Sequence, residues 1–72
     1  MGMRKNAPLP KKVGRKIQIQ RHKLNITQEE LADIVDVSRA YIGFIEQGRN
    51  APSLEVLGKI AKALKTKVSD LF

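Results

Sequence analysis

The chain has 72 residues, enough for one small domain near the lower size limit of a self-sufficient hydrophobic core. It contains no cysteine and no long apolar run, which excludes a disulfide framework, a thiolate metal site and a membrane-spanning helix. Its formal net charge of +7 favours an acidic partner such as nucleic acid. From these features we expect a cytoplasmic protein that makes no membrane contact.

The positive charge is concentrated toward the N-terminus. Residues 1–28 hold eight Lys or Arg residues and no acidic residue, whereas residues 29–72 hold six basic and seven acidic residues. We predict a flexible basic arm over residues 1–10 and a folded domain over residues 11–72. Two interpretations of the charge stay open, a solubilising tail and a surface that contacts phosphates. A membrane-surface helix is a weaker third, because a broad apolar face with Trp or Phe is missing.

A first helix is predicted from about residue 10 or 11 to Lys23. Its core-facing side consists of three apolar residues and one glutamine at helical spacing, namely Val13, Ile17, Gln20 and Leu24. A glycine inside a helix costs about 1 kcal/mol relative to Ala, so Gly14 predicts a close approach by another helix. Asn25 is expected to leave the helix in the left-handed region, which Asn adopts more easily than most residues.

A second helix is predicted to begin after Thr27. Thr27 and Glu30 have the spacing of a capping box, in which the hydroxyl and the carboxylate each accept from a backbone N–H group. Ile26 and Leu31 have the spacing of a hydrophobic staple across the same helix end. The apolar stripe of this helix is predicted to be Leu31, Ile34 and Val35.

A third helix is predicted to begin after Ser38 and to end before Gly48, where a helix commonly ends in the left-handed conformation. Its inward side is expected to carry Ile42 and Ile45, joined by either Tyr41 or Phe44. Only residues 36–37 separate this helix from the second one. So short a link forces the two helices to cross sharply, as in a helix-turn-helix.

Ser53 is predicted to cap a fourth helix. The apolar stripe of this helix is expected to be Leu57, Ile60, Ala61 and Leu64. A last helical turn then closes the core with Val68 and at least one of Leu71 and Phe72, because a chain of this size has little else to bury. Alternatively, the last two residues project outward and contribute to a dimer.

Residues of about 12–72 resemble the Xre-like (phage-repressor-like) helix-turn-helix family. The matching positions are Gly14, Ile17, Arg21, 27–32, Val37, Ser38, Ile42, Ile45, Glu46, Gly48, Pro52, Leu57, Ile60, Ala61, Ala63, Leu64, Leu71 and Phe72. The chain departs from the family at Asp36, where Gly is usual, and at Lys65 and Thr66, which replace Gly-Val. The resemblance implies an all-α fold, a compact five-helix repressor-like DNA-binding domain whose helix-turn-helix is formed by helices 2 and 3.

The resemblance also implies a structural ion pair and a set of phosphate contacts. Arg21 of the first helix is expected to pair with Glu46 of the third and to fix the two helices together. A direct role of this pair in reading DNA is the lesser alternative. Gln28 opens the second helix, where its side chain is expected to contact a DNA phosphate or to brace the next helix. The expected phosphate-contacting residues are Gln28, Ser38, Tyr41, Gln47, Arg49 and Asn50.

The third helix is the predicted recognition helix, because the second helix of the motif reaches base edges in the major groove. Arg39 suits the bidentate contact of Arg with guanine, with a phosphate contact as the alternative. Ala40 can touch a thymine methyl group. Gly43 is expected to face outward, where it either allows close approach to DNA or lies on a noncritical face. Phe44 either contacts a thymine methyl group or is partly buried. The predicted base-contacting residues are therefore Arg39, Ala40, Gly43 and Phe44.

These expectations indicate a sequence-specific transcriptional regulator, a repressor that binds a palindromic operator in double-stranded DNA as a homodimer. The alternatives are a protein-interaction (coactivator or bridging) module with an unidentified protein partner, and an antitoxin or restriction–modification controller. Non-specific packaging of nucleic acid fits the charge but leaves Arg39 without a use. An enzyme is not expected, because His22 is the only histidine and no catalytic, metal or cofactor site is indicated.

Overall fold

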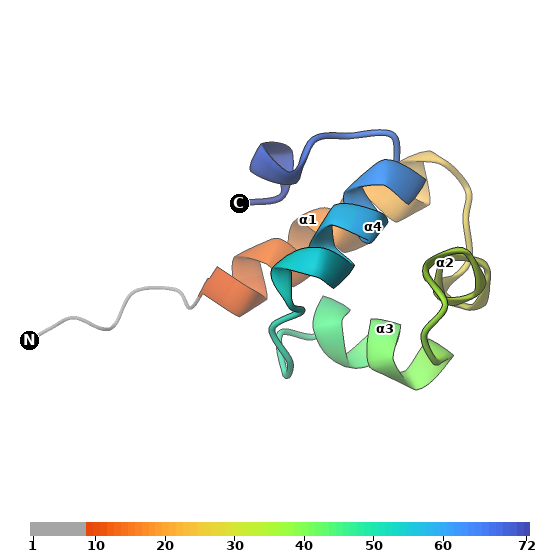
Figure 1. The fold of residues 1–72 in the computed structure, drawn as a ribbon, viewed down its shortest axis with the longest axis horizontal. Coiled ribbons are helices and arrows are strands. Elements are labelled where there is room, and N and C mark those ends of the chain that lie inside the picture. The colour runs from red at the N-terminus through yellow and green to blue at the C-terminus, as the bar shows by residue number, and fades with distance from the viewer. Residues whose placement is uncertain (1–8) are drawn as a thin grey trace, which may run out of the picture.

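The computed structural model describes residues 9–72, in which the chain forms four α-helices and a short 3₁₀ helix (Figure 1). In chain order these are α1 (Leu9–Lys23), α2 (Gln28–Val35), α3 (Arg39–Glu46), α4 (Leu54–Ala63) and the 3₁₀ helix η2 (Val68–Leu71). No β-strand occurs within residues 9–72. The predicted arm over residues 1–10 lies outside the described residues except for Leu9 and Pro10, which begin α1 slightly before its predicted start.

The prediction of a fifth α-helix is wrong for residues 9–72, because η2 is a single 3₁₀ turn. The N–H of Asp70 donates to the carbonyl of Lys67 at 3.0 Å, which is the i to i−3 spacing of a 3₁₀ helix. The Thr66 hydroxyl and the Lys67 N–H donate to the Asp70 carboxylate at 2.9 and 3.3 Å. These two hydrogen bonds hold the pKa of Asp70 below its usual value. They hold the Asp70 side chain against the residues that precede η2.

The helix boundaries follow the caps that the sequence predicts. Thr27 and Glu30 form the complete capping box, with Glu30 N–H donating to Thr27 Oγ1 at 3.0 Å and Thr27 N–H donating to Glu30 Oε1 at 2.8 Å. The hydroxyl oxygens of Ser38 and Ser53 accept from N–H groups three residues later and cap α3 and α4. Asn25 adopts the left-handed region with φ of 56°, as predicted, just after α1.

The link between α2 and α3 is a tight turn at Asp36. This residue is left-handed, with φ of 67° and ψ of 49°, a conformation that Asp tolerates better than a branched residue does. The N–H of Val37 donates to the carbonyl of Ala32 at 3.0 Å and closes the turn. Figure 1 shows α2 nearly end-on while α3 lies across the view, so the two helices cross sharply, as their short link predicts.

The hydrophobic core lies between the four helices and η2. Its fully buried large side chains are Ile17, Leu31, Val35, Ile42, Ile45, Ile60, Leu64 and Leu71. The prediction for Ile34 is wrong: its side chain is 60 % exposed, because α2 packs against α3 and α4 through other residues of the helix. Leu71 is buried and Phe72 is exposed, so only one of the last two residues belongs to the core.

Helices α1 and α3 approach each other closely at Gly14. A Cβ atom at this position would collide with the carbonyl oxygen of Ile45 and lie 2.9 Å from that of Glu46. A larger residue therefore fits only if the two helices separate. The close approach that a mid-helix glycine predicts is confirmed. None of the helices within residues 9–72 combines the length and the apolar character that crossing a membrane requires.

Candidate nucleic-acid interface

Helix α3 turns one side to solvent and the other to the core. Successive residues of an α-helix are rotated by about 100° around its axis. Five positions at and just after α3 therefore fall within an arc of about 140° on one side of the helix, namely Arg39, Ala40, Gly43, Phe44 and Gln47. The structure exposes four of the five. The expected exposure of Gly43 is wrong, because this residue is buried and the Gln28 side chain lies over it, 3.8 Å from the place of a Cβ atom.

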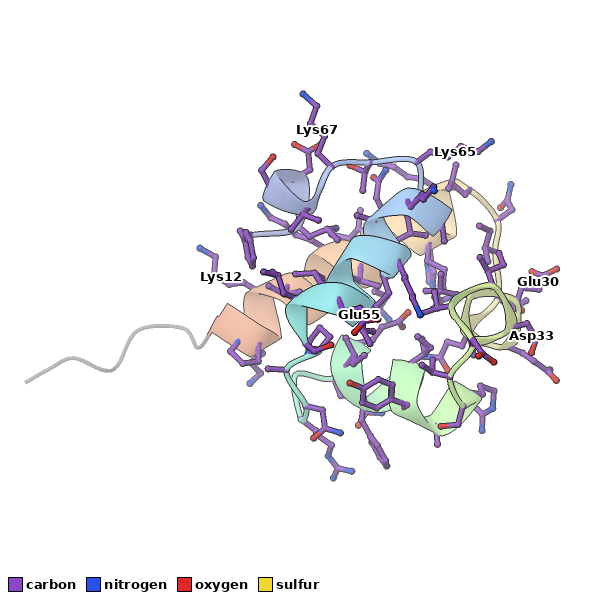
Figure 2. All side chains as sticks on the ribbon, viewed as in Figure 1. Lys12, Glu30, Asp33, Glu55, Lys65 and Lys67 are labelled. Atoms are coloured by element: carbon purple, nitrogen blue, oxygen red, sulfur yellow. The ribbon has the colours of Figure 1, made fainter. Side chains whose placement is uncertain are left out.

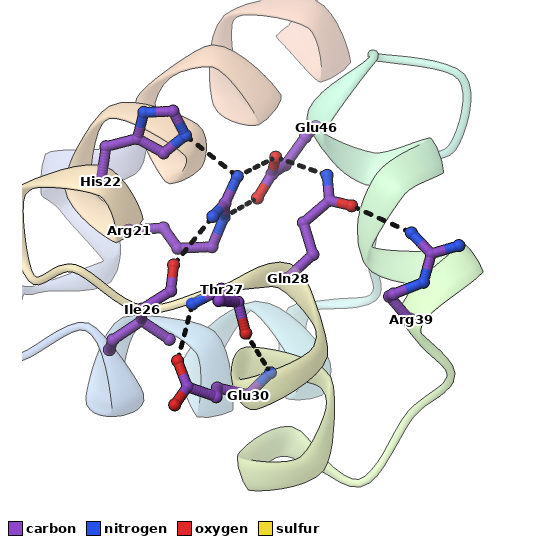
Figure 3. Close-up of polar contacts among 8 residues, drawn as sticks. All are labelled: Arg21, His22, Ile26, Thr27, Gln28, Glu30, Arg39 and Glu46. Atoms are coloured by element: carbon purple, nitrogen blue, oxygen red, sulfur yellow. Dashed lines mark hydrogen bonds and ion pairs between the residues drawn. The ribbon is translucent and has the colours of Figure 1, made fainter.

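The inner side of α3 is attached to α1 by a buried salt bridge (Figure 3). Arg21 Nε donates to Glu46 Oε2 at 2.6 Å, and Arg21 Nη2 donates to Glu46 Oε1 at 3.0 Å. The two side chains are 8 % and 2 % exposed. Arg21 Nη1 also donates to the carbonyl of Ile26 at 2.8 Å, which fixes the turn before α2. The two charges compensate each other in the interior, and removal of either would leave the other buried and unpaired.

Gln28 connects this salt bridge to the exposed side of α3 (Figure 3). Its Nε2 donates to Glu46 Oε1 at 3.0 Å, and its Oε1 accepts from Arg39 Nη1 at 3.4 Å. Because a carboxylate only accepts, Glu46 decides which end of the Gln28 amide points inward and leaves the oxygen toward Arg39. Of the two roles expected for Gln28, the structure places it against α3, and its phosphate contact stays a prediction.

Sequence reasoning expected Gln28 to brace the next helix as one of two roles but did not identify Glu46 as its partner. The two residues are 18 positions apart, and only the crossing of α2 and α3 brings them together, so no spacing in the sequence signals the pair. The contact of His22 was also missed: its Nε2 lies 3.2 Å from Arg21 Nη2, so this histidine borders the buried salt bridge. Within residues 9–72, no group of three His, Cys, Asp or Glu side chains is placed to hold a metal ion.

The C-terminal end of α3 and the loop after it bring Phe44 and Arg49 together. The Phe44 side chain is 39 % exposed, and the guanidinium carbon of Arg49 lies 5.7 Å from the centre of its ring, within reach of a cation–π attraction. The loop is held against the helix because the N–H groups of Arg49 and Asn50 both donate to the Phe44 carbonyl, at 2.9 and 3.4 Å. Phe44 is thus exposed rather than buried in the core, and its base contact stays a prediction.

The other residues predicted to contact phosphates lie at both ends of α3. Ser38 is exposed, and its hydroxyl oxygen accepts from the N–H of Tyr41 at 3.0 Å. The Tyr41 side chain packs partly against the core, while Gln47 and Asn50 are exposed. Gly48 is left-handed, with φ of 78°, and a Cβ atom there would lie 2.9 Å from the Cα of Lys11. The loop after α3 is therefore in contact with the start of α1.

Some charged side chains of the other elements are directed away from α3. Figure 2 shows Glu30 and Asp33 projecting outward from α2, and Lys65 and Lys67 on the side of the molecule opposite α3. These two lysines therefore do not face the exposed side of α3. Within residues 9–72, Arg39 and the nearby Arg49 place positive charge on that side.

Comparison with known proteins identifies relatives over most of the chain. A helix-turn-helix family model matches residues 17–71. An uncharacterized HTH-type transcriptional regulator of Archaeoglobus fulgidus is 48 % identical over 52 residues, which cover 72 % of this chain and 73 % of the relative. The control protein C.BamHI of Bacillus amyloliquefaciens is 44 % identical over 59 residues, 81 % of this chain and 73 % of the relative. The immunity repressor protein of Bacillus phage phi105 is 40 % identical over 57 residues, 79 % of this chain and 40 % of the relative.

Solved structures share the same fold. The clp gene regulator ClgR of Corynebacterium glutamicum matches with a TM-score of 0.88 and 31 % identity, over 90 % of this chain and 69 % of that chain. The restriction-modification controller protein C.AhdI of Aeromonas hydrophila matches with a TM-score of 0.84 and 32 % identity, over 88 % of this chain and 96 % of that chain. The arrangement of α1 to α4 is therefore common to this chain and to these two regulators.

Proposed function

The chain belongs to the helix-turn-helix family and is a DNA-binding transcriptional regulator, and from this premise we propose that it is a repressor whose homodimer binds a palindromic operator. In this proposal α3 enters the major groove. The observation that carries it is the two-sided construction of α3, with a buried salt bridge on one side and an exposed Arg39 on the other. A helix fixed in this way presents its side chains to bases with little loss of entropy on binding.

Arg39 is the residue proposed to read a guanine. Its Nη1 donates to Gln28 Oε1 over a long 3.4 Å, and this contact is proposed to favour one orientation of the guanidinium group before DNA binds. Its other N–H groups are available for O6 and N7 of guanine, the pair of acceptors that Arg contacts most often in specific complexes. Ala40 and Phe44 lie on the same side of α3 and are proposed to contact thymine methyl groups.

The phosphate contacts are proposed to lie at the two ends of α3 and in the loop after it. They would come from Ser38, Tyr41, Gln47, Arg49 and Asn50, with Gln28 added from α2. Such contacts fix the position of the protein on the duplex without selecting a sequence. The Phe44 carbonyl supports this assignment for the loop, because it accepts from two loop N–H groups and so sets the position of the loop relative to α3.

Two copies of the chain are proposed to act together, because one recognition helix reads only a few base pairs. A homodimer places two such helices on half-sites about 34 Å apart.

The same surface suits a second role, that of a controller in a restriction–modification system, which the similarity to C.BamHI and C.AhdI favours. The identity of the neighbouring genes distinguishes the two roles. In either role the protein is proposed to act in the cytoplasm.

The proposal is tested by selecting bound sequences from a random pool of double-stranded DNA at about physiological salt. We expect an enriched palindrome whose base preference at one position is lost in Arg39→Ala. The matched control is Lys67→Gln, which removes a cation on the side opposite α3 and should leave all base preferences unchanged. A flat pool with retained affinity would favour non-specific packaging. Absence of binding would favour a protein-interaction module.

A further inference from the structure

The exposed cations of α1 fall into two groups around the helix axis. Gly14 marks the side of α1 that packs against α3. At about 100° per residue, Lys11 and Arg15 lie about 60° and 100° from Gly14 in the same rotational sense. The other three exposed cations lie about 160–180° from Gly14, on the opposite side of the helix, namely Lys12, Lys16 and Lys23. Of the exposed cations of α1, Lys11 and Arg15 are therefore the two that border α3.

Lys11 packs against the loop that follows α3. A Cβ atom at Gly48 would lie 2.9 Å from the Cα of Lys11 and 3.0 Å from its Cγ. The next residue of the loop is Arg49, which is proposed to contact a phosphate. Figure 1 shows the start of α1 beside the C-terminal end of α3. The positive charge of the loop therefore continues onto α1 at Lys11, and Arg15 follows one turn later, about 6 Å along the helix.

Neither Lys11 nor Arg15 forms a salt bridge within residues 9–72, where the one salt bridge joins Arg21 and Glu46. The sequence offers no carboxylate on the same helix, because residues 1–28 contain no acidic residue. The fold therefore holds two cations beside a DNA-contacting loop without using their charge. Phosphate groups suit such a pair, because Lys and Arg side chains that neutralise phosphates release the counterions of the duplex.

The three cations on the opposite side of α1 have different surroundings. Lys16 Nζ donates to the carbonyl oxygen of Phe72 at 2.6 Å, so this lysine is directed toward the residue after η2. Figure 2 shows Lys12 projecting away from α3. Lys23 is the last residue of α1 and is exposed. Lys12 and Lys23 thus provide two exposed charges on the same helix that do not border α3.

We propose that Lys11 and Arg15 form a second phosphate-contacting strip, which binds the backbone of double-stranded DNA next to the phosphates that Arg49 contacts. The strip makes α1 part of the DNA interface and adds affinity without selecting bases. The inference rests on the proposed function in one respect, the docking of α3 on the duplex. It requires neither a palindrome nor a second copy of the chain.

Salt titrations on a random-sequence duplex test the strip. The double variant Lys11→Gln with Arg15→Gln is compared with Lys12→Gln with Lys23→Gln, which removes the same charge from the other side of α1. Glutamine keeps the Cβ and Cγ atoms that Lys11 places near Gly48, and circular dichroism verifies that both variants fold. We expect the slope of the logarithm of the binding constant against that of salt concentration to fall in magnitude by about two in the first variant, at about 0.9 per phosphate, and to change far less in the second. Equal slopes in the two variants would overturn the proposal, because only the total charge would then matter.

Neutral phosphate analogues locate the strip on the duplex. Single phosphates of the selected operator are replaced one at a time by uncharged methylphosphonates, and binding is measured for the wild type, for Arg49→Ala and for Lys11→Gln with Arg15→Gln. We expect some replacements to weaken the wild type but not the double variant, at phosphates beside those to which Arg49→Ala becomes insensitive. If every replacement weakens the double variant as much as the wild type, Lys11 and Arg15 do not contact phosphates.

The salt titration also separates a failure of the strip from a failure of the proposed function, because it needs no operator. A flat selection pool together with a lower slope only in Lys11→Gln with Arg15→Gln refutes the operator and supports the strip. An enriched palindrome together with equal slopes in the two double variants refutes the strip and leaves operator binding intact. Slopes equal to that of the wild type in both variants would assign these cations to solubility or to an acidic protein partner, and would overturn the strip.

Discussion

The two sides of α3 are held by different kinds of interaction. On the inner side, Glu46 and Arg21 form a salt bridge at 2.6 Å, and both side chains are buried. On the outer side, Arg39 is exposed, and its contact with Gln28 is long, at 3.4 Å. One helix of eight residues therefore combines a closely fixed face with an exposed face whose contacts within the protein are weak.

This difference separates the stability of the fold from the choice of DNA sequence. A change on the inner side leaves a buried group without its partner, so it acts on the free energy of unfolding. A change on the outer side removes nothing that the core needs, so it acts on binding. Gln28 is the exception, because its amide contacts Glu46 on one side and Arg39 on the other.

The largest effect is expected from breaking the inner side with Arg21→Ala. This change leaves Glu46 charged and buried, and we expect it to lower the free energy of unfolding by about 3–5 kcal/mol. Urea denaturation measures the loss. Arg15→Ala is the matched control, because Arg15 is an exposed arginine of the same helix, and its unfolding midpoint should not change. A midpoint in Arg21→Ala equal to that of the control would contradict a stabilising role for the salt bridge.

A second change tests the close packing of α1 on α3. Gly14→Ala places a methyl group against the Ile45 carbonyl oxygen, and we expect it to lower the free energy of unfolding by about 1–3 kcal/mol. Gly58→Ala is the control, since nothing lies within 4 Å of a Cβ atom there. That change should stabilise the protein by about 0.4–1 kcal/mol, because Ala restricts the unfolded chain more than Gly does. Thermal melts that shift in the same direction for both variants would contradict this packing.

On the outer side, Arg39→Ala is expected to weaken binding to the selected operator by about 1–3 kcal/mol and to relax one base position. The free energy of unfolding should stay the same, because Arg39 is exposed. Binding titrations on the operator and on single-base variants measure both effects. Equal losses on every DNA sequence would assign Arg39 to the phosphate backbone instead.

Gln28→Ala sharpens the comparison because it affects both sides at once. We expect it to lower the free energy of unfolding by about 1 kcal/mol, since Glu46 keeps its two hydrogen bonds from Arg21. It should also weaken the base preference at the Arg39 position, though less than Arg39→Ala does, because the guanidinium group loses its support. An undiminished base preference would show that Gln28 does not orient Arg39 in the complex.

The smallest and most uniform effect is expected from Arg49→Ala. A phosphate contact adds affinity on every sequence, so this change should weaken binding about equally on specific and random duplexes. The slope of the logarithm of the binding constant against the logarithm of salt concentration should fall in magnitude by about one. Titrations at several salt concentrations measure it. A loss confined to the operator would place Arg49 among the residues that read bases.

Local signals in the sequence were sufficient for the helix boundaries. Caps at Thr27, Ser38 and Ser53 are confirmed because each depends on groups only three residues apart. The left-handed conformation of Asn25 follows from residue type in the same way. Gly14 predicted a close helix neighbour, although the sequence did not say which atoms it meets. The base and phosphate contacts assigned to α3 stay predictions.

By itself, the sequence determined the α1–α4 elements, their ends and most of the core stripe, because hydrogen bonds and periodicity act over a few residues. Only the tertiary structure decided that Ile34 is exposed, that Gly43 lies under Gln28, and that the last element is a 3₁₀ turn. It alone brought Gln28 of α2 against Glu46 of α3. The physical reason is that burial and contact depend on how helices cross, and residues far apart in the chain set those crossings together.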